Sequence, residues 1–217
     1  MVKMVVLIKW LAHASFQIKG GEKVVYIDLA RGEASDKADL ILVTHSHSDH
    51  CNRSQIQKVR KKDTVIIAPN DCASEIGGKV ETLEPGEETT LGGITVKAVA
   101  AYNIRRFRSP GIPYHPKDFG VGYLITIENK TIYHAGDTDF IPEMQQLGHV
   151  DVALLPSGDK YTMDNTEAAE AAIAINPKTV IPMHRWSTKP KKFKTKVETA
   201  SNINVVLLQE GDEFEVT

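Results

Sequence analysis

The sequence predicts an α/β fold in which two β-sheets pack face to face and helices cover their outer faces. The first observation is that the 217-residue chain has two strand-rich blocks, one near the start and one in the middle. The second is that mixed strand and helix patterns follow each block. Each sheet can then bury one face against the other sheet and one against helices. The length suits one domain over residues 1–217.

The first half opens with short segments that are rich in apolar and β-branched residues, which is the composition of strands. The run Leu40–Val43 is apolar throughout and is typical of a strand buried on both faces. The strands expected around it are Val5–Lys9, Ala14–Ile18, Val24–Asp28 and Thr64–Ala68, with a turn at Gly20-Gly21. We also expect a helix over Arg53–Arg60 and a short helix that Asp71 caps and that runs through Glu75.

The second half begins with another group of strands and ends in an alternating pattern. The strands expected first are Glu88–Thr90, Ile94–Ala100, Val121–Ile127 and Thr131–His134, with turns at Gly92-Gly93 and Asn129-Lys130. The pattern that follows predicts strands Val150–Leu155 and Thr179–Ile181, helices Asn165–Ala174 and Pro190–Thr199, and strands Asn204–Leu208 and Glu213–Val216. Between the strands lies Tyr102–Phe119, an irregular connection rich in Pro and Arg. Connections of that length are usually functional or disordered.

Composition narrows the classes of partner. The chain is 41% hydrophobic and 25% charged with a formal net charge of −2, which is ordinary for a globular protein. This balance gives no general attraction to nucleic acid or to an anionic membrane. We therefore expect a small-molecule substrate and no membrane partner, a nucleic-acid partner is disfavoured, and we leave a homo-oligomer open.

Cysteine content and the N-terminus indicate a location in the cytoplasm. Cys51 and Cys72 are too few for a disulfide framework, which favours a reducing compartment. Residues 1–10 are apolar but contain Lys3 and Lys9, and no small-residue cleavage site follows. We interpret them as a first strand, not a signal peptide. No stretch of the sequence is long and apolar enough to span a bilayer.

A cluster of metal-ligand residues follows Leu40–Val43 directly, in the segment His45–His50, which reads H-S-H-S-D-H. In extended backbone, residues two apart face the same side, so His45 and His47 can bind one cation. Asp49 and His50 follow a turn and can face a second. Imidazole and carboxylate suit zinc, manganese and iron. A loop of solvated histidines is the alternative, but three histidines and an aspartate after a buried strand disfavour it.

The spacing H-x-H-x-D-H after an apolar strand resembles the signature of the metallo-β-lactamase superfamily. The fold that this resemblance implies is a four-layer αββα sandwich of two mixed sheets. Later landmarks appear in the same order: Tyr133–Asp139 reads Y-H-A-G-D-T-D and Ile181–His184 reads I-P-M-H. They resemble the segments that supply, respectively, an aspartate bridging two metals and a late histidine of the second site. The resemblance extends from His13 to His184.

A finer resemblance concerns Trp10–Phe16, which reads W-L-A-H-A-S-F. It is similar to the branch containing ascorbate-6-phosphate lactonase and N-acyl-phosphatidylethanolamine phospholipase D. Residues 101–103, 115–117 and 161–164 resemble a prokaryotic subgroup near that branch, whose members are described as metal-dependent hydrolases.

The resemblance implies two divalent metal ions, with zinc as the first expectation and manganese, iron or nickel as alternatives. The implied ligands are His45, His47, His115 and Asp137 for site one, and Asp49, His50, Asp137 and His184 for site two. The family usually supplies a third histidine just after the strand corresponding to Ile94–Ala100, where this chain reads Ala-Tyr-Asn. His115 is assigned in its place. If His115 does not bind, Asn103 or water completes site one, or the protein holds one metal.

Five residues are assigned to substrate contacts: His13, Asn103, Arg106, His134 and Tyr161. For both His13 and His134, a contact with substrate or with a ligand histidine is favoured over direct ligation. Asp28 and Asp139 are further candidates to orient ligand histidines. The arginines of the irregular loop and the basic residues after His184 suit an anionic substrate, with a solvated basic surface as an equal alternative. Asp164 or Asn165 is equally a helix cap.

These residues predict a metal-dependent hydrolase. A bound cation lowers the pKa of water from about 16 towards 7, which provides hydroxide for attack on an ester, lactone or phosphodiester. Asp49 and Asp137 are the catalytic candidates, the former as metal ligand and orienting group and the latter as metal bridge. A di-iron oxidoreductase and a non-catalytic metal-binding protein of the same fold are the alternatives. The first usually has an additional electron-carrying domain.

Overall fold

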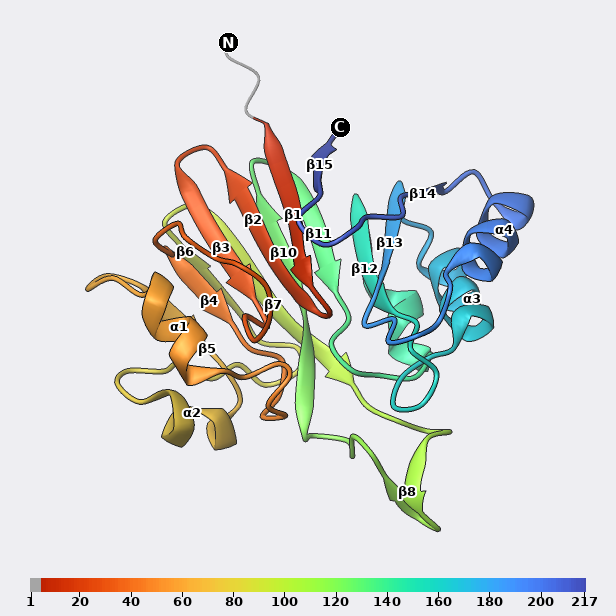
Figure 1. Ribbon diagram of the computed structural model, residues 1–217, viewed down its shortest axis with the longest axis horizontal. Coiled ribbons are helices and arrows are strands. Elements are labelled where there is room, and N and C mark those ends of the chain that lie inside the picture. The colour runs from red at the N-terminus through yellow and green to blue at the C-terminus, as the bar shows by residue number, and fades with distance from the viewer. Residues whose placement is uncertain (1–4) are drawn as a thin grey trace.

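The early strands build the first sheet, in the order β15-β1-β2-β3-β4-β5, and most of their residues are buried. Its strands are β1 (Val6–Ala12), β2 (Ser15–Gly20), β3 (Lys23–Ile27), β4 (Leu40–Leu42), β5 (Val65–Ile67) and β15 (Glu213–Val216). Val25 and Ile27 face the second sheet, while Tyr26 between them faces outward. The helices α1 (Arg53–Val59) and α2 (Asn70–Ile76) cover that outward face (Figure 1).

The second sheet has the order β14-β13-β12-β11-β10-β7-β6 and is also mixed. Its strands are β6 (Glu88–Leu91), β7 (Ile94–Ala101), β10 (Gly120–Ile127), β11 (Lys130–His134), β12 (Val152–Pro156), β13 (Thr179–Met183) and β14 (Asn204–Val205). The helices α3 (Asn165–Ile175) and α4 (Lys191–Ala200) cover its outer face (Figure 1). Asp164 caps α3 by accepting hydrogen bonds from the backbone N–H groups of Thr166 and Glu167.

The main core lies between the two sheets. Phe16 and Ile18 from the first sheet pack in one apolar cluster with Tyr123 and Ile125 from the second. Two further clusters lie between each sheet and its helices. The four layers are therefore helices, sheet, sheet and helices, which confirms the fold class expected from the sequence.

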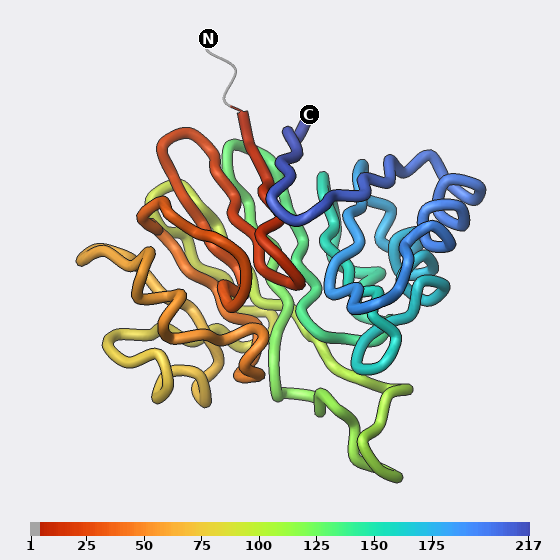
Figure 2. The backbone as a smooth tube through the Cα atoms, in the orientation of Figure 1, coloured from red at the N-terminus to blue at the C-terminus, as the bar shows by residue number. Residues whose placement is uncertain are grey.

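The computed structural model describes residues 5–217, so the first four residues of the N-terminal strand prediction lie outside it. Within the described part, β1 pairs antiparallel with β15, and Figure 2 shows the start of β1 beside the C-terminus. No helix in this part of the chain has the length and apolar character needed to cross a membrane.

Three local features differ from what the sequence predicted. The irregular loop contains a small hairpin of β8 (Phe107–Ser109) and β9 (Ile112–Pro113), which projects from the body (Figure 1). A 3-10 helix, η1 (Pro142–Gln146), was not expected. The Asp71 cap is also wrong, because α2 begins at Asn70 with Pro69 in the cap position and Asp71 lies in the first turn. Short elements of this kind have little periodicity, so tertiary contacts decide them.

Candidate metal centre

Four connections place ligand-type side chains at one edge of the sandwich. His13 lies in the turn between β1 and β2, and the segment His45–His50 follows β4. Asp137 follows β11 and His184 follows β13. The backbone N–H of His184 donates to the carbonyl of His13 at 3.0 Å, which joins the two sheets at this edge.

The first group of ligand atoms consists of three ring nitrogens. His47 Nδ1 lies 3.1 Å from His45 Nε2 and 3.2 Å from His115 Nε2. All three nitrogens lie within 4.8 Å of one another. The structure thus brings His115 from the irregular loop to the place that the sequence analysis assigned to it.

Asn103 holds His115 in this orientation. Its Oδ1 accepts the backbone N–H of His115 at 2.9 Å and lies 2.8 Å from His115 Nδ1. This arrangement puts the proton on Nδ1 and directs Nε2 towards His47. Asn103 was assigned to substrate binding, but it is buried and does not border the cavity at the site. The structure makes it a positioning residue.

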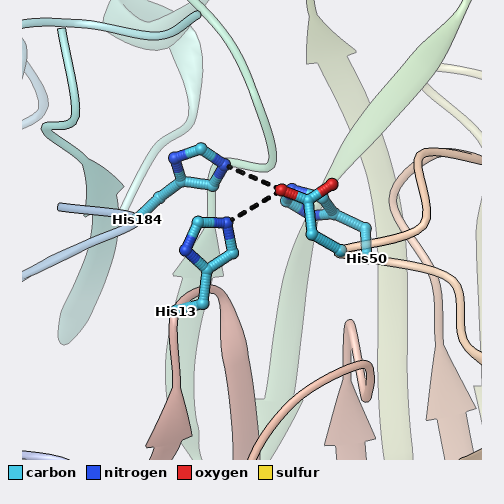
Figure 3. Close-up of side chains that lie close together, drawn as sticks. His13, His50 and His184 are labelled. Atoms are coloured by element: carbon cyan, nitrogen blue, oxygen red, sulfur yellow. Dashed lines mark hydrogen bonds and ion pairs between the residues drawn. The ribbon is translucent and has the colours of Figure 1, made fainter. Parts of the chain in front are cut away.

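The second group contains His13, Asp49, His50 and His184, whose ligand atoms lie within 4.8 Å of one another. Asp49 Oδ2 is 3.1 Å from His13 Nε2 and 3.9 Å from His184 Nε2. Figure 3 shows the rings of His13 and His184 directed at one carboxylate, with His50 beside it. For His13 the sequence analysis favoured a contact with substrate or with a ligand over direct ligation; the structure places its Nε2 among the ligand-type atoms of this group.

Asp137 lies between the two groups. Its Oδ2 is 3.4 Å from His115 Nε2 in the first group and 3.2 Å from His184 Nε2 in the second. Its Oδ1 is 3.4 Å from His50 Nε2. One carboxylate therefore faces histidines of both groups, as expected of a bridging ligand.

The donor atoms of this centre fit a bound cation. Among residues 5–217, His50 Nε2, His184 Nε2 and Asp137 Oδ1 are buried without a hydrogen-bond partner. Buried polar atoms without partners are costly and uncommon. A divalent metal ion would satisfy these atoms together, and imidazole with carboxylate is the donor chemistry that zinc accepts.

Asp28 orients His50 from behind. Its Oδ2 lies 2.7 Å from His50 Nδ1 and accepts the Thr44 hydroxyl at 2.8 Å, while its Oδ1 accepts the Thr44 backbone N–H. This leaves His50 Nε2 facing Asp137. A carboxylate behind a ligand histidine is a usual companion of metal sites. The sequence analysis named Asp28 for this kind of role.

Burial and neighbouring charges shift the pKa values of these histidines in different directions. Burial lowers the pKa of His45 well below its usual value and that of His115 to about 4. For His50, burial opposes the charged form, but the carboxylates of Asp137 and Asp28 outweigh it and raise the pKa. Burial likewise disfavours ionised Asp137, but His184 and His50 hold its pKa well below the usual range. Neutral imidazoles and an ionised carboxylate are the forms that bind metal.

The backbone is strained where these side chains meet. His13, Asp28 and His184 adopt left-handed conformations, with φ values of 55°, 47° and 47°. Such conformations are uncommon for residues other than glycine and often occur at functional sites. Gly136 also has a positive φ, and a Cβ there would lie 2.8 Å from the carbonyl oxygen of Val121. Only glycine therefore fits the turn that presents Asp137.

Two of the assigned substrate residues belong to the scaffold instead. Arg106 Nη1 pairs with Asp139 at 2.6 Å and with Glu167 at 2.5 Å, so its charge is already neutralised. His134 is buried; its Nε2 donates to the carbonyl of Ala14 at 2.9 Å and its Nδ1 accepts the backbone N–H of Gly136. Neither side chain borders the cavity at the centre. Both assignments are corrected.

Other sequence assignments can now be placed. Tyr161 borders the cavity beside the two groups. Asp139, a candidate to orient a histidine, instead accepts backbone N–H groups of the irregular loop and pairs with Arg106. Cys51 is buried in the core beneath α1 and α2 and does not belong to a ligand group. Arg31, Tyr114 and Trp186 also border the cavity, and no sequence motif pointed to them.

Replacing Asn103 with alanine should weaken metal binding at the first group. His115 would lose the acceptor that directs its Nδ1, so its ring would rotate more freely. Loss of such a partner typically costs 10–100-fold in metal affinity, measurable here by zinc titration against a chromophoric chelator. The matched control is Asn202→Ala, because Asn202 is exposed on the bend before β14 and has no left-handed backbone. Unchanged affinity in Asn103→Ala would contradict this role.

The metal-free protein should lose stability when the pH falls from 7 towards 4. His115 has a folded-state pKa of about 4, below its usual 6.5, so between these values the unfolded chain binds more protons. His45 shifts in the same direction. The raised pKa of His50 does not oppose this loss, because its stabilising contribution is already complete below pH 6.5. Thermal unfolding of chelator-treated protein at several pH values measures the effect.

A matched pair of variants tests which histidines cause this dependence. His115→Asn should flatten the stability curve between pH 4 and 6.5. Gln145→Ala should leave it unchanged, because Gln145 is exposed and has no ionisable group. Equal curves for the wild type and His115→Asn would contradict the assignment.

Comparison with known proteins supports the fold and a metal-dependent hydrolase. Residues 7–184 match the family model described as the beta-lactamase superfamily domain. A UPF0173 metal-dependent hydrolase from Thermococcus kodakarensis is 36% identical, with 97% of this chain and 100% of the relative covered. Another from Pelotomaculum thermopropionicum is 33% identical, with 96% and 99% covered.

A crystal structure from Parabacteroides distasonis is also similar, with a TM-score of 0.87 and 33% identity over 95% of this chain and 94% of that one. The finer resemblance to the lactonase and phospholipase D branch stays a prediction. Matches of this extent and identity do establish the wider grouping. The chain belongs to the metallo-β-lactamase superfamily and, within it, to the UPF0173 family of metal-dependent hydrolases.

Proposed function

We propose that this protein is a hydrolase with a dinuclear metal centre that cleaves an ester, lactone or phosphodiester bond of a small substrate. The observation that supports two metals is Asp137, whose carboxylate faces both groups of histidines. The first site would use His45, His47 and His115, and the second His13, Asp49, His50 and His184, with Asp137 shared. Zinc is the first expectation for both.

His13 enters this ligand set in place of a substrate contact. Its Nε2 lies 3.1 Å from Asp49 Oδ2, and its ring centroid is 3.9 Å from that of His184. Two imidazoles so close beside a carboxylate favour a shared cation, because neutral rings gain little from this crowding. With His13, the second site has its own four ligands as well as Asp137.

When bound, divalent cations lower the pKa of water towards 7 and polarise the bond to be cleaved. Asp137 is only 3% exposed at its side chain, so its role is to hold the centre together. Asp49 is 22% exposed at its side chain and borders the cavity. Asp49 is therefore the carboxylate that can orient the attacking water.

Metal analysis combined with a hydrolysis screen tests the proposal. We expect about two equivalents of zinc, manganese, nickel or iron after reconstitution of chelator-treated protein. Hydrolysis of generic phosphodiester, phosphomonoester, ester and lactone substrates should follow the metal content. Iron with consumption of oxygen would indicate the oxidoreductase instead, and bound metal without turnover of any substrate would indicate a binding protein.

A further inference from the structure

We infer that the substrate of this centre is a small molecule that combines an oxyanion, carboxylate or phosphate, with an aromatic or similarly planar group. The inference rests on the proposed function, because it concerns the cavity beside the candidate metal centre. That cavity has a volume of about 490 Å³ and is bordered by Asp49, His115, Asp137 and His184. This volume suits a single small molecule.

Two arginines supply positive charge at this cavity. Arg31 follows β3, and Arg108 lies on β8 of the projecting hairpin. Neither guanidinium lies within 4.0 Å of a carboxylate among residues 5–217, in contrast to Arg106. Arg108 Nη2 donates only to the carbonyl of Tyr114, at 3.2 Å. Both arginines therefore keep donors available for an oxyanion, and the planar guanidinium matches carboxylate and phosphate geometry.

Aromatic rings form another wall of the same cavity. The ring centroids of Tyr114 and Tyr161 lie 4.8 Å apart, and those of Tyr161 and Trp186 lie 6.2 Å apart. Trp186 is 50% exposed and has a left-handed backbone with φ of 47°. Together with the partly exposed Tyr114 and Tyr161, this ring forms a continuous aromatic surface, and such a surface is typical of a binding site.

The charged and aromatic walls meet at Arg31 and Trp186. The Arg31 guanidinium carbon lies 5.5 Å from the centroid of the Trp186 ring. The ring centroids of His13 and Trp186 lie 4.9 Å apart in an edge-to-face contact. An oxyanion bound by Arg31 would thus lie beside an aromatic surface and next to the second ligand group. A planar group joined to an oxyanion can contact both the arginines and the aromatic rings, whereas a simple anion or a neutral ring can contact only one of them.

Calorimetric titration of the zinc-loaded full chain tests this with four probes that differ in ring and charge. Benzoate and phenylphosphonate have both features, benzamide has the ring alone, and acetate has the charge alone. We expect benzoate or phenylphosphonate to bind about tenfold more tightly than benzamide and acetate, the scale of a charge-assisted hydrogen bond. Tighter benzoate identifies a carboxylate substrate, and tighter phenylphosphonate identifies a phosphate substrate.

Variants distinguish the contributions of the arginines and of the Trp186 ring to probe binding from that of the metal. Arg31→Met and Arg108→Met should each weaken the better anionic probe about tenfold while leaving benzamide within about twofold. Trp186→Leu should weaken benzoate and benzamide at least fivefold, roughly the loss of a buried ring contact, with acetate unchanged. Arg105→Met is the matched control, because Arg105 is exposed on the same loop and does not border the cavity.

Two results would overturn the inference. If benzamide bound as tightly as both anionic probes, the cavity would not recognise an oxyanion. Unchanged anion binding in both arginine variants would mean that the metal alone holds the anion. The assay requires no turnover, so it separates this inference from the proposed hydrolysis. Probe binding as expected without hydrolysis of any substrate would reject the hydrolase and retain the binding site.

Discussion

Asp137→Ala is expected to abolish stable metal binding and to lower kcat/KM by at least about 10³-fold. The carboxylate of Asp137 faces His50 and His184 in one group and His115 in the other. Its removal leaves each group without its shared anion, and the pKa of His50 loses one of the two carboxylates that raise it. Metal catalysis contributes several kcal/mol to such reactions, and each 1.36 kcal/mol is about tenfold in rate.

The measurement is metal content after dialysis together with steady-state kinetics. Asp137→Asn keeps the volume of the side chain and should show the same losses with a melting temperature close to that of the metal-free wild type. Asp63→Ala is the matched control, because Asp63 is exposed on the turn before β5. An Asp137→Ala protein that is free of metal yet fully active would reject metal-assisted hydrolysis.

Arg106→Met should destabilise the fold by about 3 kcal/mol and change metal binding little. Removal of one partner from a buried ion pair typically costs about 3–5 kcal/mol, because the other charge stays buried. Here Asp139 is fully buried and the Glu167 side chain is 6% exposed. The lower end of the range applies, because backbone N–H groups of Ile104 and Arg105 still donate to Asp139 and that of Phe140 to Glu167.

Urea denaturation of the metal-free proteins measures this loss as a lower midpoint with an unchanged slope. Arg105→Met is again the control, since that arginine forms no ion pair among the described residues and should stay within about 0.5 kcal/mol of the wild type. If Arg106 bound substrate, its variant would raise KM and leave the midpoint unchanged. That outcome would reject the scaffold role.

Two residues of the binding cavity, Arg31 and Trp186, could not be identified from the sequence. Arg31 follows an ordinary strand, and Trp186 lies in a basic segment that resembles a solvated surface. They meet where the loop after β13 lies against the first sheet, at the point where the backbone N–H of His184 donates to the carbonyl of His13. Conversely, Arg106 resembled a ligand for anions in sequence, but its carboxylate partners are 33 and 61 residues away.

The sequence by itself determined the two-sheet architecture and the cluster His45–His50, because strand periodicity and ligand spacing are local properties. Asp137 and His184 were also identified, through short motifs at strand ends. Only the tertiary structure decided that His13 joins the second group and that Asn103 positions His115. The physical reason is that the ligand role of a histidine depends on which ring nitrogen is free and what faces it, and contacts between distant segments set both.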